Sequence, residues 1–95
     1  MNIEITARHF TASEELRNYA DEKVKKIYRY FENPISCHVI IEEINPDYLT
    51  EIKLTVSGSQ FFVKDTSGEI KQSIDRAVDK MIAKLIKYKD KRYSH

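Results

Sequence analysis

The sequence predicts an α+β fold with the element order βαβββα, in which two helices pack on one face of a four-stranded sheet. Four short segments alternate apolar and polar residues, as strands with one buried face do. Two longer segments repeat their apolar residues every three or four positions, as amphipathic helices do. The last three strands follow one another through short turns, which implies antiparallel pairing, and two helices on one face would bury both apolar stripes.

The first strand and the first helix occupy the N-terminal third of the chain. Residues 2–8 (NIEITAR) alternate and predict the strand. The helix follows within residues 9–34, where Thr11 and Ser13 are both candidate N-caps and Pro34 disfavours helix at the residue before it, so we expect about five turns. Its core-facing stripe consists of Leu16, Ala20, Val24, Ile27 and Phe31.

Three further strands follow, separated by two segments of turn residues. The alternating segments predict strands at 35–44, 51–57 and 60–65. The turns between them are NPDY at 45–48 and SGS at 57–59. The expected sheet is therefore built mainly from the middle of the chain.

The second helix closes the chain. Thr66 and Glu69 have the spacing of a capping box, and no breaker interrupts the helical pattern before about Lys91. We therefore expect a helix of some six turns.

Length and composition predict one folded domain, residues 1–95. Such a length supports a single core, and 41% apolar with 33% charged residues argues against disorder and against a membrane span. The N-terminus lacks the pattern of a signal peptide, which favours a cytoplasmic protein. Cys37 lies in a strand-like segment and cannot pair within the chain, so we expect a buried small hydrophobe.

Charge is distributed unevenly, although the net charge is only +1. Residues 42–51 contain four acids and no Lys or Arg, whereas residues 84–95 contain five Lys or Arg and one acid. The sequence therefore predicts a dipolar surface, which would orient the molecule on a charged partner.

The second helix separates its residues into apolar, acidic and basic faces. At about 100° per residue, five cations fall within roughly 80° of the helix circumference. This basic stripe consists of Arg76, Lys80, Lys84, Lys87 and Lys91. Asp75, Asp79 and Asp90 form the acidic face, which we expect to point away from any RNA, and Lys89 lies opposite the stripe. Lysines also suit a helix C-terminus, so either an anionic partner or the macrodipole could explain the stripe.

The first helix carries a second basic strip, in which Lys23 and Lys26 alternate with Tyr19 and Tyr30. Tyrosines beside lysines can stack on bases while the lysines reach phosphates. The same tyrosines could instead be boundary residues with packed rings and solvated hydroxyls. If both helices grip one anionic partner, this strip and the basic stripe should face it together.

Catalysis and metal binding find no support in the sequence. His9, His38 and His95 are dispersed, the chain has two glycines, and the neighbouring carboxylates of residues 42 and 43 would point to opposite faces of a strand. We expect no enzyme, no catalytic residue, no cofactor and no metal site. His38 is interpreted as a sheet residue with ordinary polar partners.

Two segments carry a resemblance to a known family. TARHFTASEELRNYADEKVKKIYRYFENP, followed by SIDRAVDKMIAKLIKYKDKRYSH, resembles the ribosome hibernation promoting factors, also called ribosome-associated inhibitors or sigma-54 modulation proteins. The resemblance covers essentially the whole chain. Its most specific parts are LR at 16–17, Lys23, Lys26 with the aromatic pair at 30–31, and the pattern from Ile74 to Lys91.

The resemblance implies a fold akin to double-stranded-RNA-binding domains and a role in translation. Members bind the small ribosomal subunit near the decoding centre, block messenger and transfer RNA, and inhibit translation in stationary phase or stress. The implied ribosomal-RNA-binding residues are Arg17, Lys23, Lys26, Lys80, Lys87, Lys89 and Lys91. Arg76 and Lys84 join them by geometry alone, and Arg92 joins them through the basic C-terminal segment.

This chain departs from the family pattern at the start of the second helix. Glu69, Ile70 and Lys71 stand where members often have Asp-Met-Tyr, which puts any role of that tyrosine in doubt. The length matches the short form of the family, without a C-terminal dimerisation domain, and such members act with a separate ribosome modulation factor in some bacteria. No membrane and no small-molecule substrate are implied.

One alternative function belongs to a different class. The protein could be an interaction module that modulates a sigma factor or another transcription component. It would then use the acidic segment or the open sheet face, where Lys53, Thr55 and Phe62 are expected to lie.

Overall fold

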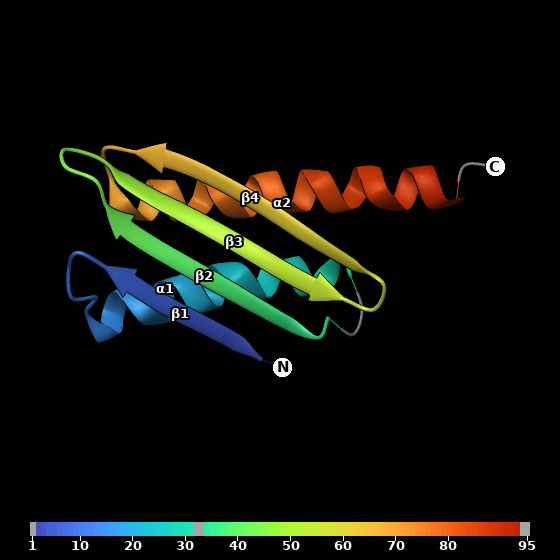
Figure 1. Ribbon diagram of the computed structural model, residues 1–95, viewed down its shortest axis with the longest axis horizontal. Helices are drawn as coiled ribbons and strands as arrows, with labels where there is room; N and C mark the ends of the chain where they lie inside the picture. Colours follow the sequence, from blue (N-terminus) through green and yellow to red (C-terminus); the bar gives the residue numbers. More distant parts are fainter. Residues whose placement is uncertain (1, 32–33, 94–95) are drawn as a thin grey trace.

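The computed structural model describes residues 2–31 and 34–93, with side chains as far as Lys89, and has the predicted element order (Figure 1). The elements are β1 (Ile3–Arg8), α1 (Glu14–Lys25), the 3₁₀ turn η1 (Lys26–Arg29), β2 (Ser36–Glu43), β3 (Tyr48–Val56), β4 (Ser59–Ser67) and α2 (Ile70–Tyr93). The strands lie in the order β1-β2-β3-β4, and both helices cover one face of this sheet (Figure 1). The predicted α+β architecture is confirmed.

Strand pairing follows the expected pattern. The β2–β3 and β3–β4 pairs are antiparallel, and β1 pairs in parallel with β2 because α1 carries the chain across the sheet between them. A two-residue turn joins β3 to β4, and its Gly58 has φ +81°, a conformation that favours glycine. β1 and β4 are therefore the two edges of the sheet.

The first helix is shorter than the prediction. Ser13, rather than Thr11, is its N-cap: the Ser13 Oγ accepts the backbone N–H of Leu16 at 3.1 Å. The α-helix ends at Lys25 and tightens into η1. Ile27 on this turn is fully buried and Phe31 just beyond it packs on other aromatic rings, so the apolar stripe serves the core despite the change of helix type.

β3 and β4 are longer than the alternation indicated, because polar residues occupy their core-facing ends. Thr50 and Ser73 are fully buried and their hydroxyl oxygens lie 2.8 Å apart, in a hydrogen bond between β3 and α2. Ser67 donates to Gln72 Oε1 at 2.6 Å and accepts the backbone N–H of Glu69 at 3.2 Å. The predicted capping box at Thr66 and Glu69 is thus wrong: Ser67 accepts the N–H of Glu69, the residue that precedes α2.

The core lies between the sheet and the two helices. Its largest fully buried side chains are Ile27, Ile41, Ile52, Leu54, Ile74, Met81 and Leu85. Cys37 is buried on β2, as predicted, and burial raises the pKa of its thiol to about 12. The opposite face of the sheet is open.

Three aromatic rings pack where α2 passes the end of the sheet. Tyr88 stacks on Phe31 with ring centroids 6.1 Å apart and planes 5° apart, and it lies 5.0 Å from Phe61. These contacts join the segment that follows η1 to β4 and α2. Figure 1 shows α2 continuing beyond this point to the C-terminus.

Replacing Tyr28 with phenylalanine is expected to stabilise the protein. The Tyr28 hydroxyl is buried without a hydrogen-bond partner among the described residues, so its removal should raise the free energy of unfolding by about 1 kcal/mol at neutral pH. Burial also raises the pKa of Tyr28 to about 12, above roughly 10 in the unfolded chain. The wild type should therefore lose stability as the pH rises from about 10 to about 12, because the unfolded chain ionises this phenol before the native state does.

Urea unfolding of wild type and Y28F between neutral pH and pH 12 measures this effect. The advantage of Y28F should grow above pH 10, since the variant has no phenol to ionise at this position. Equal stability of the two proteins across this range would contradict the burial of the hydroxyl.

Candidate nucleic-acid interface

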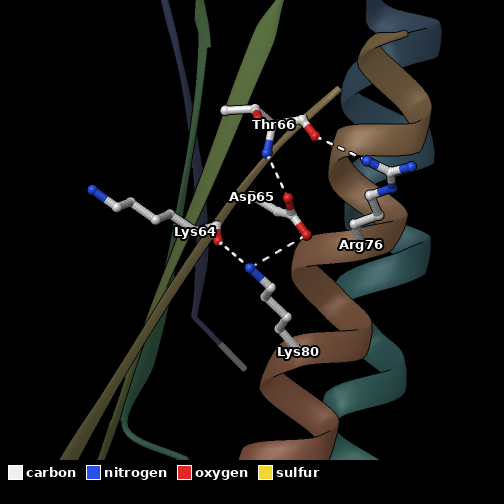
Figure 2. Close-up of polar contacts among 5 residues, drawn as sticks. All are labelled: Lys64, Asp65, Thr66, Arg76 and Lys80. Atoms are coloured by element: carbon white, nitrogen blue, oxygen red, sulfur yellow. Dashed lines mark hydrogen bonds and ion pairs between the residues drawn. The ribbon is translucent and has the colours of Figure 1, made fainter. Parts of the chain in front are cut away.

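Three cations of the basic stripe bind the backbone of β4 and form what we call the cation row: Arg76, Lys80 and Lys84. Arg76 Nη1 donates to the Thr66 carbonyl oxygen at 3.2 Å, and Lys80 Nζ donates to that of Lys64 at 3.1 Å (Figure 2). Lys84 Nζ donates to the carbonyl oxygen of Phe62 at 3.0 Å. The three side chains thus run along the outer edge of the sheet.

The repeat of the helix matches the repeat of the strand. Cations four residues apart on α2 are separated by about 6 Å, and acceptors two residues apart on β4 by about 6.6 Å. Val56 and Ser59 close the two-residue turn, so alternate residues of β4 point their backbone groups away from β3. Phe62, Lys64 and Thr66 are in that set, which is why their carbonyls are open to the cations.

Asp65 adds a charged contact to the row. Its carboxylate accepts the Thr66 backbone N–H at 2.8 Å and lies 3.4 Å from Lys80 Nζ (Figure 2). The Lys64 side chain points away from α2 in the same view. Lys80 is therefore held by two acceptors from β4 while about half of its side chain remains exposed.

The basic strip of α1 faces the acidic side of α2. Lys23 Nζ lies 3.5 Å from Asp75 Oδ1, and the Tyr19 hydroxyl donates to the same oxygen at 2.7 Å. Lys23 and Lys71 lie over the Tyr19 ring, 5.6 and 5.1 Å from its centroid. Asp75 raises the pKa of Lys23, and burial together with Asp75 raises the pKa of Tyr19. Lys26 lies in the same groove between the helices.

These contacts correct one expectation. Asp75 was predicted to point away from the candidate interface, yet it lies against Lys23. The strip of α1 lies in the groove between the helices, whereas the cation row of α2 lies along β4. The acidic face of α2 separates them, so the positive surface is two tracks rather than one.

The other candidate residues lie in different surroundings. Arg17 Nη1 donates to the Ile5 carbonyl oxygen on β1 at 2.9 Å, at the opposite sheet edge from the cation row. Lys87 is exposed, and Lys89 is half-buried on the other side of α2, as the helical spacing predicted. The side chains of Lys91 and Arg92 lie outside the described residues.

The acidic segment lies far from the basic C-terminal part of α2. Glu43 and Asp47 flank the turn between β2 and β3, and Glu42 pairs with His9 at 3.3 Å. Figure 1 shows this hairpin at one end of the molecule and the C-terminus at the other. The acidic hairpin and the C-terminal part of α2 thus lie at opposite ends of the molecule (Figure 1).

His38 has the polar partners expected of a sheet residue: its Nε2 lies 2.9 Å from Thr6 Oγ1 and 3.2 Å from Glu4. His95 lies outside the described residues. Within residues 2–31 and 34–93, no three His, Cys, Asp or Glu side chains are grouped so as to hold a metal ion. No helix in this part of the chain is long and apolar enough to cross a membrane.

Comparison with known proteins identifies the family. Residues 3–93 match the family model described as sigma 54 modulation protein / S30EA ribosomal protein. The chain belongs to this family. The family inferred from the sequence is therefore confirmed.

Curated members of the family align over almost the whole chain. The ribosome hibernation promoting factor of Salmonella typhimurium is 25% identical over 95 residues, which is 100% of both chains. That of Azotobacter vinelandii is 29% identical over 91 residues, covering 96% of this chain and 85% of the relative.

Solved structures of family proteins share the fold. The N-terminal domain of Thermus thermophilus Protein Y has a TM-score of 0.84 at 22% identity, covering 93% of this chain and 99% of the domain. A ribosomal subunit interface protein from Coxiella burnetii has a TM-score of 0.87 at 21% identity, covering 94% and 98%. At these levels of sequence identity, the two structures support the architecture alone.

Sequence reasoning identified the cations of the candidate interface but did not identify the groups that accept hydrogen bonds from them. Nothing in the spacing of Arg76, Lys80 and Lys84 indicated that their acceptors are backbone carbonyls of another element. The Asp75–Tyr19 hydrogen bond was missed too, because it joins residues 56 positions apart in the sequence.

Proposed function

We propose that this protein is a cytoplasmic ribosome hibernation factor. It binds the small ribosomal subunit near the decoding centre, blocks the binding of messenger and transfer RNA, and inhibits translation in stationary phase or stress without catalysing a reaction. Family membership and the ribosome hibernation promoting factors among its relatives support this role. A separate ribosome modulation factor is the further partner that we propose.

The observation that carries the proposal is the ordered positive surface of α2. Each cation of the row is fixed by one hydrogen bond to β4, while an ammonium or guanidinium group has further donors free for phosphate oxygens. Holding three such groups at a regular spacing lowers the conformational entropy lost when they bind a phosphate backbone. This arrangement suits a strand of nucleic acid better than a single small anion.

Exposed cations complete the proposed contact. Lys26 and Lys87 are exposed and no described side chain pairs with them, so they are free to bind phosphates directly. The contribution of Lys23 is reduced by its ion pair with Asp75. Arg17, Lys89 and Lys91 remain in the proposed set through the family resemblance, and Arg92 remains in it through the basic C-terminal segment.

Sedimentation of the protein with purified small subunits over a range of salt concentrations tests the proposal. If about six to ten phosphates are engaged, affinity should fall at least about 10³-fold between roughly 50 and 200 mM salt. A salt dependence near zero would contradict phosphate binding. A complex that is recovered from cell lysate without ribosomal RNA, and that survives nuclease treatment, would instead favour the alternative role in transcription.

A further inference from the structure

The outer edge of β4 has the backbone groups that strand pairing requires. β4 is nine residues long, and none of the described strands pairs with it on the side away from β3. Phe62, Lys64 and Thr66 direct their backbone groups outward there, as the register with β3 requires. Edges of this kind pair readily with another strand unless charge, a bulge or a covering segment prevents it.

The cation row occupies this edge. Three of the four outward carbonyls, those of Phe62, Lys64 and Thr66, accept a hydrogen bond from α2, and the Thr66 N–H is bound by Asp65. The outward N–H groups of Phe62 and Lys64 have no acceptor among the described residues. The edge is thus covered on three of its acceptors and open at Gln60 and at the two N–H groups.

We propose that the cation row closes the β4 edge against antiparallel pairing with β4 of a second copy of this chain. The proposal concerns the free protein and goes beyond the proposed function, because it requires no RNA.

A second copy is the occupant that the edge itself favours. Two β4 strands related by a two-fold axis at Lys64 would place Phe62 opposite Thr66, with outward donors and acceptors matched in both directions. Phe62 is 47% exposed and would add apolar contact beside this junction. In the wild type, pairing would require displacing three cations on each copy and would bring six like charges together, which opposes it.

Removing the row is expected to release this association. The variant R76A/K80A/K84A keeps good helix formers in α2 but has no donors for the β4 carbonyls. Sedimentation velocity, from micromolar to near-millimolar protein, should show the wild type as a monomer and the variant shifting to twice the mass. In the variant dimer, hydrogen exchange at the amides of Phe62 and Lys64 should slow.

Two further variants make the result specific. K71A/K87A/K89A removes the same charge from α2 outside the row and should stay monomeric. Adding Lys64→Pro to the triple variant removes the central outward N–H without removing a bond to β3, and should restore the monomer. If the triple variant loses its helical circular dichroism, K80A/K84A repeats the measurement with Arg76 retained.

The outcomes distinguish the explanations. A folded variant that stays monomeric at the highest concentration overturns the proposal. Equal association of the control variant, or a dimer that persists with Lys64→Pro, also overturns it, because the association would then be unrelated to the edge. Since all arms are run without ribosomes, failure of the proposed function would leave these results unaffected.

Discussion

The double variant K26E/K87E should bind small ribosomal subunits on the order of 100-fold more weakly than the wild type. Both lysines are exposed and form no ion pair with a described residue; Lys26 belongs to the basic strip of α1, and Lys87 to the basic stripe of α2 outside the cation row. Each reversal removes one phosphate contact and adds a repulsion. The slope of log affinity against log salt should therefore decrease in magnitude by about two, which is about one for each phosphate contact that is lost. Co-sedimentation at several salt concentrations measures both quantities.

The matched control is K53E/K64E, which changes the charge equally on the open face of the sheet. Lys53 and Lys64 are exposed there and belong to neither track. This control should retain nearly full affinity, and both variants should melt close to the wild type, since exposed charges contribute little to stability. If K53E/K64E abolishes binding while K26E/K87E does not, the sheet face is the contact surface and the assignment to the helices is wrong.

The largest loss of stability is expected from Leu85→Ala. Leu85 is a fully buried core residue of α2. Truncating its side chain should therefore lower the free energy of unfolding by about 3 kcal/mol. In a domain of this size, such a loss corresponds to a fall in melting temperature of roughly 10–20 °C. Thermal and urea unfolding followed by circular dichroism would measure it.

Ile86→Ala is the control for this prediction. Ile86 is the next residue on the same helix but is 43% exposed, so its truncation should cost only about 0.5 kcal/mol. Equal losses from the two variants would show that helix propensity, rather than core packing, controls the stability of α2. Because Leu85 adjoins Lys84 and lies one turn from the ring of Tyr88, its loss should also weaken ribosome binding in proportion to unfolding at the assay temperature.

The sequence was sufficient to predict a structural element where its residue pattern depends only on that element. The apolar repeat in α1 and α2 identified buried residues such as Leu16 and Met81, because burial alone determines that repeat. It failed at the ends of β3 and β4, where Thr50 and Ser67 are polar yet buried and form hydrogen bonds with side chains of α2. A single strand segment cannot reveal a partner that another element supplies.

The candidate site shows the same limit. Helical spacing correctly aligned the basic stripe and placed Lys89 opposite it. It could not show that the stripe lies along β4, nor that the α1 strip faces Asp75, because both facts depend on how the helices are rotated against the sheet. The bonds of Arg17 to β1 and of the cation row to β4 are likewise contacts between distant parts of the chain.

Because the cations of α2 and the carbonyls of β4 repeat at nearly the same spacing, insertions and deletions between them are restricted. A single residue inserted between Phe62 and Arg76 would rotate the helix by about 100° relative to the strand, or turn alternate strand residues to the other face of the sheet. All three bonds of the row would be lost together. Insertions and deletions should therefore be rare in this segment among relatives that keep the three cations, even where individual side chains in it vary freely.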